Sequence, residues 1–101
     1  MATLEIRALA QDDIDSASAG YYAQDPRLVP RFLQALDVAF ARIQDAPERF
    51  PFVQAPVRRV MLRKFPYSIY YVFESQKVGV LAVLHHRRSP KHWKRRVTKA
   101  V

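Results

Sequence analysis

The chain is predicted to fold as an α+β domain with its elements in the order βααβββ. The strands are expected to form one mainly antiparallel sheet, with an αα-hairpin packed on one face. Apolar residues recur at helical spacing through two consecutive segments of the first half, and only a few residues join these segments. The second half holds three short runs of β-forming residues with brief connections, which favours a β-meander.

The first expected element is a strand over residues 3–9, where apolar and polar side chains alternate. A helix follows, with Asp12 or Asp13 as its N-cap and an end near residues 24–26. Its apolar positions are Ile14, Ala17, Tyr21 and Tyr22. The sequence therefore predicts that a helix packs against the core directly after the first strand.

A second helix is expected to start near Pro26 or Pro30 and to end at residues 45–47. Its apolar stripe has the period of an amphipathic helix. The stripe consists of Leu28, Phe32, Leu36, Phe40 and Ile43, helped by Leu33, Ala35 and Ala39. Because the connection to the preceding helix is short, the two helices are expected to run antiparallel.

Three strands are expected after an irregular loop over residues 47–56, which holds three prolines. They cover residues 57–65, 68–74 and 78–85. The last of them is apolar on both faces, as a central strand covered on both sides would be.

Length and composition indicate one domain over residues 1–96, followed by a disordered basic tail over residues 97–101. From about Lys94 the chain is basic and lacks an apolar pattern, so this end is expected to be frayed. The absence of cysteine excludes disulfides, thiol catalysis and cysteine-bound zinc. The start of the chain does not resemble a signal peptide, and no stretch reaches the roughly 18 apolar residues of a membrane span. We expect a cytoplasmic protein without a cofactor or a membrane partner.

Charge divides the chain into two unequal parts. Residues 1–56 carry 5 basic and 8 acidic side chains, a net charge of −3. Residues 57–101 carry 12 basic and 1 acidic side chain, a net charge of +11. A positive field concentrated on one part of a small domain indicates a polyanion or an acidic protein as partner.

Several motifs together resemble the RelE/ParE superfamily of toxins from bacterial type II toxin–antitoxin systems. Residues 62–71 read LRKFPYSIYY, like the arginine-bearing strand and following hairpin of that superfamily. Residues 80–90 read VLAVLHHRRSP, like its last strand and H-x-R-R-x-P ending, with Trp93 close behind. The resemblance covers roughly residues 3–93 and includes residues 10–23 of the first helix.

The resemblance implies growth inhibition and plasmid stabilisation by one of two mechanisms. RelE-like members cut mRNA in the ribosomal A site, and ParE-like members poison DNA gyrase. It also implies a cognate antitoxin as partner, with operator DNA contacted only indirectly through that antitoxin.

The resemblance implies three catalytic residues if the chain is a nuclease: Arg63, His86 and Arg87. Arg63 would stabilise the scissile phosphate, and a histidine would act as general acid. The alternative for Arg63 is a strand residue that pairs with Glu74 or faces solvent. Candidate bases are few: Glu74 lies at the far end of its strand, and Glu48 is the only acid near the loop where some nuclease members carry theirs. The lysine-rich segment that RelE-like enzymes place before the arginine strand is missing.

A target- or antitoxin-binding surface is expected on the basic part of the chain. Its residues are Arg58, Arg59, Arg63, Arg87, Arg88, Lys91 and Trp93. Trp93 has two interpretations that are equally favoured: a partner surface, or a side chain that fixes the chain end to the core. His85, His86 and His92 do not have the spacing of a metal motif, so no metal site is expected.

The incomplete catalytic set favours a ParE-like toxin that acts on gyrase. A RelE-like, ribosome-dependent mRNA endoribonuclease is one alternative, and a non-toxic basic nucleic-acid-binding module is another.

Overall fold

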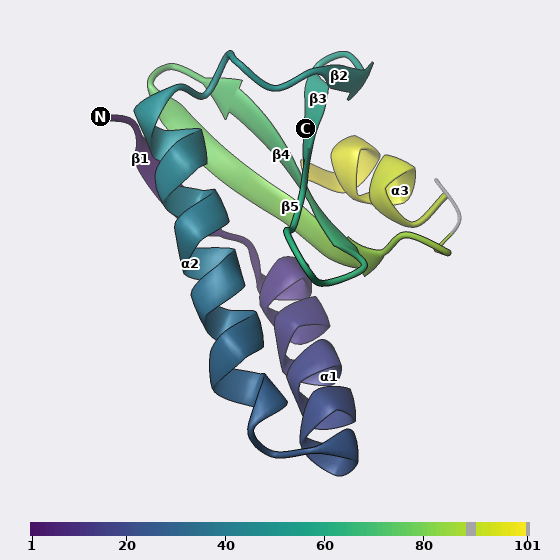
Figure 1. Ribbon diagram of the computed structural model, residues 1–101. Coiled ribbons are helices and arrows are strands. Elements are labelled where there is room, and N and C mark those ends of the chain that lie inside the picture. Colours follow the sequence, from purple (N-terminus) through teal and green to yellow (C-terminus); the bar gives the residue numbers. More distant parts are fainter. Residues whose placement is uncertain (89–90, 101) are drawn as a thin grey trace.

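The computed structural model describes residues 1–88 and 91–100, with the backbone alone described for residues 91 and 98–100. The elements are β1 (Thr3–Ile6), α1 (Ala8–Gln24), α2 (Leu28–Asp45), β2 (Phe52–Gln54), β3 (Val57–Met61), β4 (Tyr67–Glu74), β5 (Lys77–His85) and α3 (Lys91–Ala100) (Figure 1). The predicted α+β class, the mainly antiparallel sheet and the αα-hairpin are confirmed.

The strands form one sheet in the order β1-β5-β4-β3-β2. β1 pairs with β5 in parallel, and the other neighbours pair antiparallel. β4 and β5 are joined by Ser75 and Gln76, whose φ angles of 52° and 63° give the left-handed turn that suits a two-residue hairpin. The sheet therefore brings the N-terminal strand beside the last strand, far from it in sequence.

The hairpin of α1 and α2 covers one face of the sheet, and its closed end projects past the sheet (Figure 1). Buried apolar side chains from both layers form the main core. The helices contribute Ala10, Ile14, Ala17, Phe32, Leu36, Ala39, Phe40 and Ile43, and the sheet contributes Val60, Ile69, Tyr71, Val78, Val80 and Val83. The helical stripes expected from the sequence thus supply the core, although Tyr22 and Leu33 remain 64% and 40% exposed.

The first helix begins earlier than the sequence predicts. It starts at Ala8, where the Gln11 backbone N–H already donates to the Arg7 carbonyl at 2.9 Å. The predicted N-cap at Asp12 or Asp13 is wrong, because both lie inside the helix. The Asp13 carboxylate instead accepts the Val83 backbone N–H at 2.9 Å and pairs with an arginine of α3.

The loop between α2 and β3 is more ordered than a plain loop, since it contains β2, which the sequence did not predict. β3 ends at Met61 rather than at residue 65. Residues 62–66 leave the sheet in a loop. A hydrogen bond closes this loop, in which the Leu62 N–H donates to the Tyr67 carbonyl at 2.9 Å. Lys64 in this loop has a φ angle of 69°, a conformation that a strand cannot contain.

Helix α3 covers the other face of the sheet, which the predicted arrangement left bare. Buried Trp93 stacks on Tyr70 of β4, with ring centres 5.7 Å apart and planes 17° from parallel. A second apolar cluster forms there from Val57, Tyr70, Leu81, Ala82, Leu84 and Trp93. β5 is therefore covered on both sides, as its sequence predicts.

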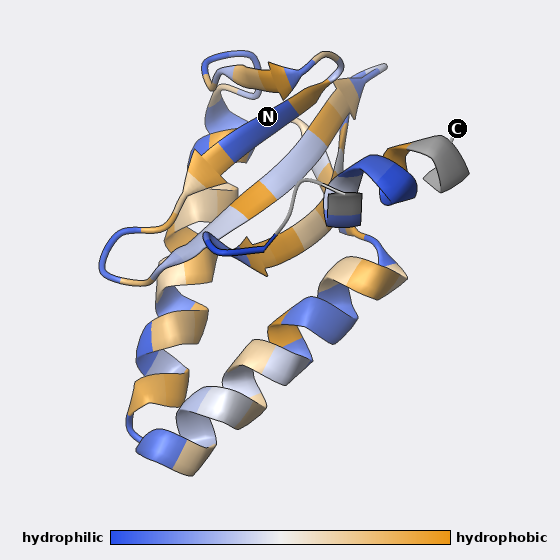
Figure 2. Cartoon of the chain, turned by 90° about the vertical axis from the view of Figure 1, so that its right-hand side faces the viewer, coloured by the Kyte–Doolittle hydropathy of each residue, from blue (hydrophilic) through white to orange (hydrophobic). Residues whose placement is uncertain are grey.

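The chain end differs from the frayed tail expected from about Lys94. Helix α3 continues to Ala100, and only Val101 of the predicted tail lies outside the described residues. Trp93 and Val97 are four residues apart, so both lie on one face of the helix and pack against the second apolar cluster. Figure 2 shows α3, beside the C label, as mostly hydrophilic with a short hydrophobic stretch.

One edge of β5 is left open where β1 stops pairing with it after Val80. A bulge at this point places Leu81 between the paired residues Val80 and Ala82. The Leu81 carbonyl accepts a hydrogen bond from Arg96 at 3.1 Å, and the Val83 N–H donates to Asp13. Two side chains thus take the place of a neighbouring strand.

Candidate functional site: a basic groove between α2 and the β3–β4 loop

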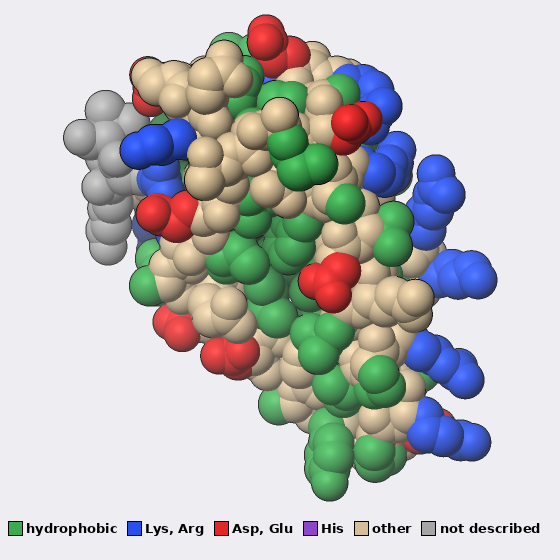
Figure 3. Space-filling model, turned by 90° about the vertical axis from the view of Figure 1, so that its left-hand side faces the viewer, with side chains coloured by type: hydrophobic (Ala, Val, Ile, Leu, Met, Phe, Trp, Pro, Cys, Tyr) green, Lys and Arg blue, Asp and Glu red, His purple; other side chains and the backbone are tan. Residues whose placement is uncertain are grey.

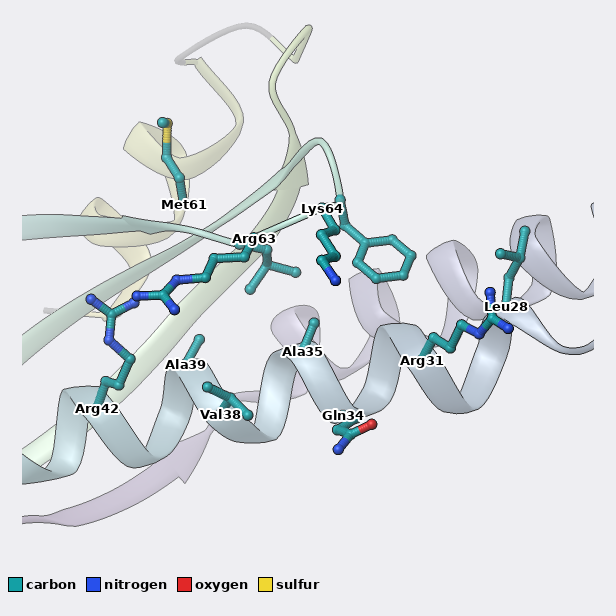
Figure 4. Close-up of a pocket in the computed structure, with 12 residues that line it drawn as sticks. Leu28, Arg31, Gln34, Ala35, Val38, Ala39, Arg42, Met61, Arg63 and Lys64 are labelled. Carbon is teal, nitrogen blue, oxygen red and sulfur yellow. The ribbon is translucent and has the colours of Figure 1, made fainter.

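A groove of about 560 Å³ separates α2 from the end of β3 and the β3–β4 loop (Figure 4). We call it the α2 groove. It is lined by Leu28, Arg31, Gln34, Ala35, Val38, Ala39, Arg42, Met61, Leu62, Arg63, Lys64 and Phe65.

Sequence spacing explains the α2 wall of this groove. Residues 28, 31, 35, 38 and 42 recur every three or four positions, so they lie along one side of the helix. The opposite wall depends on Phe65, which packs edge to face against Tyr21 and Phe32 at 5.3 and 5.4 Å between ring centres. These contacts fix the β3–β4 loop against the helical hairpin.

The groove combines an apolar interior with a cationic rim. Ala35, Ala39, Leu62 and Phe65 are apolar, and Arg31, Arg42, Arg63 and Lys64 supply four positive charges. In Figure 4, the side chains of Arg42 and Arg63 extend toward one another from the two walls. Within residues 1–88, none of the four cations forms an ion pair with a carboxylate.

This arrangement suits an acidic, amphipathic peptide segment. Aliphatic side chains of such a segment would contact the apolar interior, and its carboxylates would meet guanidinium groups able to hold two oxygens at once. Figure 3 shows Lys and Arg side chains in a row along one edge of the molecule, whereas the acidic ones are scattered over the visible face. Most of the Lys and Arg side chains visible in this view therefore lie at that edge.

A second, smaller cavity of about 460 Å³ lies between α1 and the other side of the same loop. Tyr21, Tyr67 and His85 line it, together with Lys64, which also lines the α2 groove. Burial raises the pKa of Tyr21, and nearby Tyr67 adds to the effect. The Tyr21 phenol is therefore a neutral hydrogen-bonding group at physiological pH.

Arg63 is the predicted site residue that the structure places in the α2 groove. Arg58 has a structural task as well, because its Nη1 donates to the Glu48 and Phe50 carbonyls at 3.0 and 2.7 Å. Arg59 is exposed on β3.

The remaining predicted residues lie beyond β5 or in α3. His86, Arg87 and Arg88 are exposed, and the His86 N–H donates to the Pro66 carbonyl at 2.9 Å. Trp93 is only 6% exposed, so it fixes α3 to the sheet. The side chain of Lys91 lies outside the described residues.

The possible nuclease residues lie near one loop, because the His86 N–H donates to the carbonyl of Pro66 in the β3–β4 loop that carries Arg63. Arg63 is in the β3–β4 loop, and His86 and Arg87 follow β5 at the same end of the sheet. Across residues 1–88, no hydrogen bond, ion pair or ring contact joins Arg63 to either of them. The described part of the chain also holds no group of three or more histidine or carboxylate side chains that could bind a metal ion.

The sequence-based prediction missed Arg31 and Arg42, which belong to the net-acidic part of the chain. Their position relative to the apolar stripe of α2 was a usable signal, because residues 31, 35, 38 and 42 share a helix face. The net charges of the two parts of the chain did not indicate these arginines, because both lie in the part whose net charge is negative.

Comparison with known proteins identifies a family and solved structures with a related fold. The family model of the ParE toxin of the type II toxin–antitoxin system, parDE, matches residues 4–90. A solved structure from the chromosomal ParDE TA system of P. aeruginosa is 18% identical, with a TM-score of 0.75 over 84% of this chain and 96% of that chain. No curated protein sequence matches significantly. Among the described residues, no helix has the length and apolar character needed to cross a membrane.

Proposed function

The chain belongs to the ParE toxin family of type II toxin–antitoxin systems, and we propose that it inhibits growth by acting on DNA gyrase until a cognate antitoxin occupies the α2 groove. The family match over residues 4–90 supports the toxin role. Gyrase is cytoplasmic, so the proposal places the protein there.

The α2 groove is the observation that carries the antitoxin part of the proposal. Its apolar interior provides the contact that gives tight binding, and its four cations select a partner with acidic side chains. Any contact with operator DNA would then be made through the antitoxin.

The ParE family match and the shortage of candidate bases favour gyrase over ribosome-bound mRNA. General acid–base cleavage of RNA needs groups that meet at one phosphate. A toxin that acts by binding a protein target needs no such set of catalytic groups. The exposed basic residues Arg59, Arg87 and Arg88 remain our candidates for target contact.

Induced expression in bacteria tests the proposal. We expect growth arrest, relief when the adjacent reading frame is co-expressed, and inhibition of gyrase supercoiling by the purified protein. Codon-specific cuts in ribosome-bound mRNA would instead establish the nuclease alternative. Normal growth with confirmed soluble protein, in the native host and a surrogate, would contradict the toxin role.

A matched pair of α2 variants tests the groove. Val38 and Leu33 are both exposed aliphatic residues of α2, at 50% and 40%, but only Val38 lines the groove. Val38→Glu should neutralise a cation and displace an apolar contact, so the antitoxin should no longer relieve growth arrest. Leu33→Glu should leave relief intact, and equal behaviour of the two variants would contradict the groove assignment.

A further inference from the structure

Three arginines gather around two phenylalanine rings just beyond one end of the α2 groove. The guanidinium carbons of Arg42 and Arg49 lie 5.3 and 5.0 Å from the centre of the Phe50 ring. The guanidinium carbon of Arg58 lies 3.8 Å from the centre of the Phe52 ring. We call this set the Phe50 cluster.

The cluster is held in place by the backbone of the loop that carries it. Arg58 spans two loop carbonyls, as described above, and Arg49 donates weakly to the Arg42 carbonyl at 3.4 Å. The Tyr71 hydroxyl donates to the Pro47 carbonyl at 2.7 Å. These contacts orient the guanidinium groups before any partner binds, which lowers the entropic cost of binding.

The three arginines of the cluster have no carboxylate within ion-pair distance in residues 1–88. Arg42 also lines the α2 groove, so cluster and groove form one continuous surface. An anionic group placed here would face several charge-assisted donors at once.

We propose that the Phe50 cluster binds an acidic, extended segment of the antitoxin that continues from the segment in the α2 groove. This inference rests on the proposed function and adds a second contact with its own chemistry. The groove holds apolar side chains, and the cluster holds carboxylates from the adjoining stretch of the same partner.

An acidic peptide fits this surface better than nucleic acid does. The adjoining groove has an apolar interior suited to aliphatic side chains, which a phosphate backbone lacks. Asp45 and Glu48 are exposed in the same stretch of chain and would repel a long polyanion.

The test measures association and dissociation rates between the purified chain and the product of the adjacent reading frame. Arg49 is exposed, so Arg49→Glu should act mainly on association, lowering its rate roughly tenfold at low salt and much less at high salt. Arg95→Glu is the matched control, because it makes the same charge change on exposed α3. It should change the rate by about twofold or less, the effect of net charge alone.

The same measurements separate failure of this inference from failure of the proposed function. If Val38→Glu greatly speeds dissociation while Arg49→Glu behaves like Arg95→Glu, the groove stands and the cluster proposal is overturned. If the adjacent product does not bind the wild-type chain, the proposed function itself fails.

Two further outcomes decide the chemistry of the ligand. Replacing an acidic residue of the antitoxin by lysine should restore fast association with the Arg49→Glu variant. The wild-type chain could instead bind a single-stranded oligonucleotide. If Arg49→Glu abolished that binding without changing the antitoxin rates, the cluster would be assigned to nucleic acid and the proposal would be overturned. Thermal unfolding of each variant confirms that the fold is intact.

Discussion

Asp13 of α1 and Arg96 of α3 form a two-point ion pair that joins the first helix to the last. Arg96 Nη2 lies 3.1 Å from Asp13 Oδ1, and Nη1 contacts Oδ2. The two side chains are only 14% and 17% exposed. This pair crosses the open edge of β5 and fixes α3 relative to the helical hairpin.

Breaking this pair should destabilise the fold. Asp13→Asn removes the carboxylate charge from Arg96, and Arg96→Gln removes the cation, so each should lower the unfolding free energy by about 2 kcal/mol. Urea denaturation measures the change, and hydrogen exchange should show the loss first in α3. The Asp25–Arg27 pair is the control, since the Arg27 side chain is 83% exposed: Arg27→Gln should have little effect. Equal effects would mean that burial of the Asp13–Arg96 pair is irrelevant.

Trp93→Ala should be among the most destabilising single changes in the chain. The indole is buried and stacks on Tyr70, so its removal leaves a cavity between α3 and the sheet. We expect a loss of about 3–5 kcal/mol in denaturant unfolding. Met61→Ala, 55% exposed on β3, should change stability by about 0.5 kcal/mol or less. A small effect of Trp93→Ala would contradict tight docking of α3.

Tyr71 should make the fold sensitive to alkaline pH. Burial raises its pKa from 10.0 to about 12, although the charges of Arg58 and Arg49 oppose this. Between these values the unfolded chain has released the proton and the folded chain retains it, so stability falls as pH rises. Tyr71→Phe should cost about 1 kcal/mol at neutral pH through loss of the Pro47 hydrogen bond.

Denaturation at several pH values checks the sign of this effect. The stability difference between wild type and Tyr71→Phe should shrink as pH rises above about 10, because the variant lacks this proton. A difference that stays constant to pH 11 would show that Tyr71 titrates alike in both states.

Two substitutions distinguish the toxin mechanisms. In a gyrase inhibitor, His86→Gln removes no catalytic group, so supercoiling inhibition should persist within a small factor. In a nuclease, Arg63→Ala and His86→Gln should each slow single-turnover cleavage by roughly 10²-fold or more. Wild-type cleavage of ribosome-bound mRNA that vanishes with Arg63→Ala would reverse our assignment.

Periodic patterns made most of the fold predictable. The stripe containing Phe32, Leu36 and Phe40 located α2, and continuous apolar residues in β5 indicated that both its faces are covered. The start of α1 was missed because Asp13 looks like a helix cap, although its partners are Val83 and the distant Arg96. Tertiary contacts of this kind leave no local pattern.

The candidate site was only partly predictable for a related reason. Arg63 was singled out from its own segment, and the structure places it in the groove. Arg31 and Arg42 join it only because α2 runs alongside the β3–β4 loop (Figure 4). Helix α3 was missed because its cations dominate the composition and hide the spacing of Trp93 and Val97.

The open edge of β5 bears on how this protein behaves when no antitoxin is present. A strand edge with free N–H and carbonyl groups invites pairing with another chain, which leads to aggregation. Here the Val83 N–H and the Leu81 carbonyl are already bonded to side chains, so an incoming strand finds these two groups occupied. The same ion pair that anchors α3 thereby disfavours pairing of another strand at this part of the β5 edge.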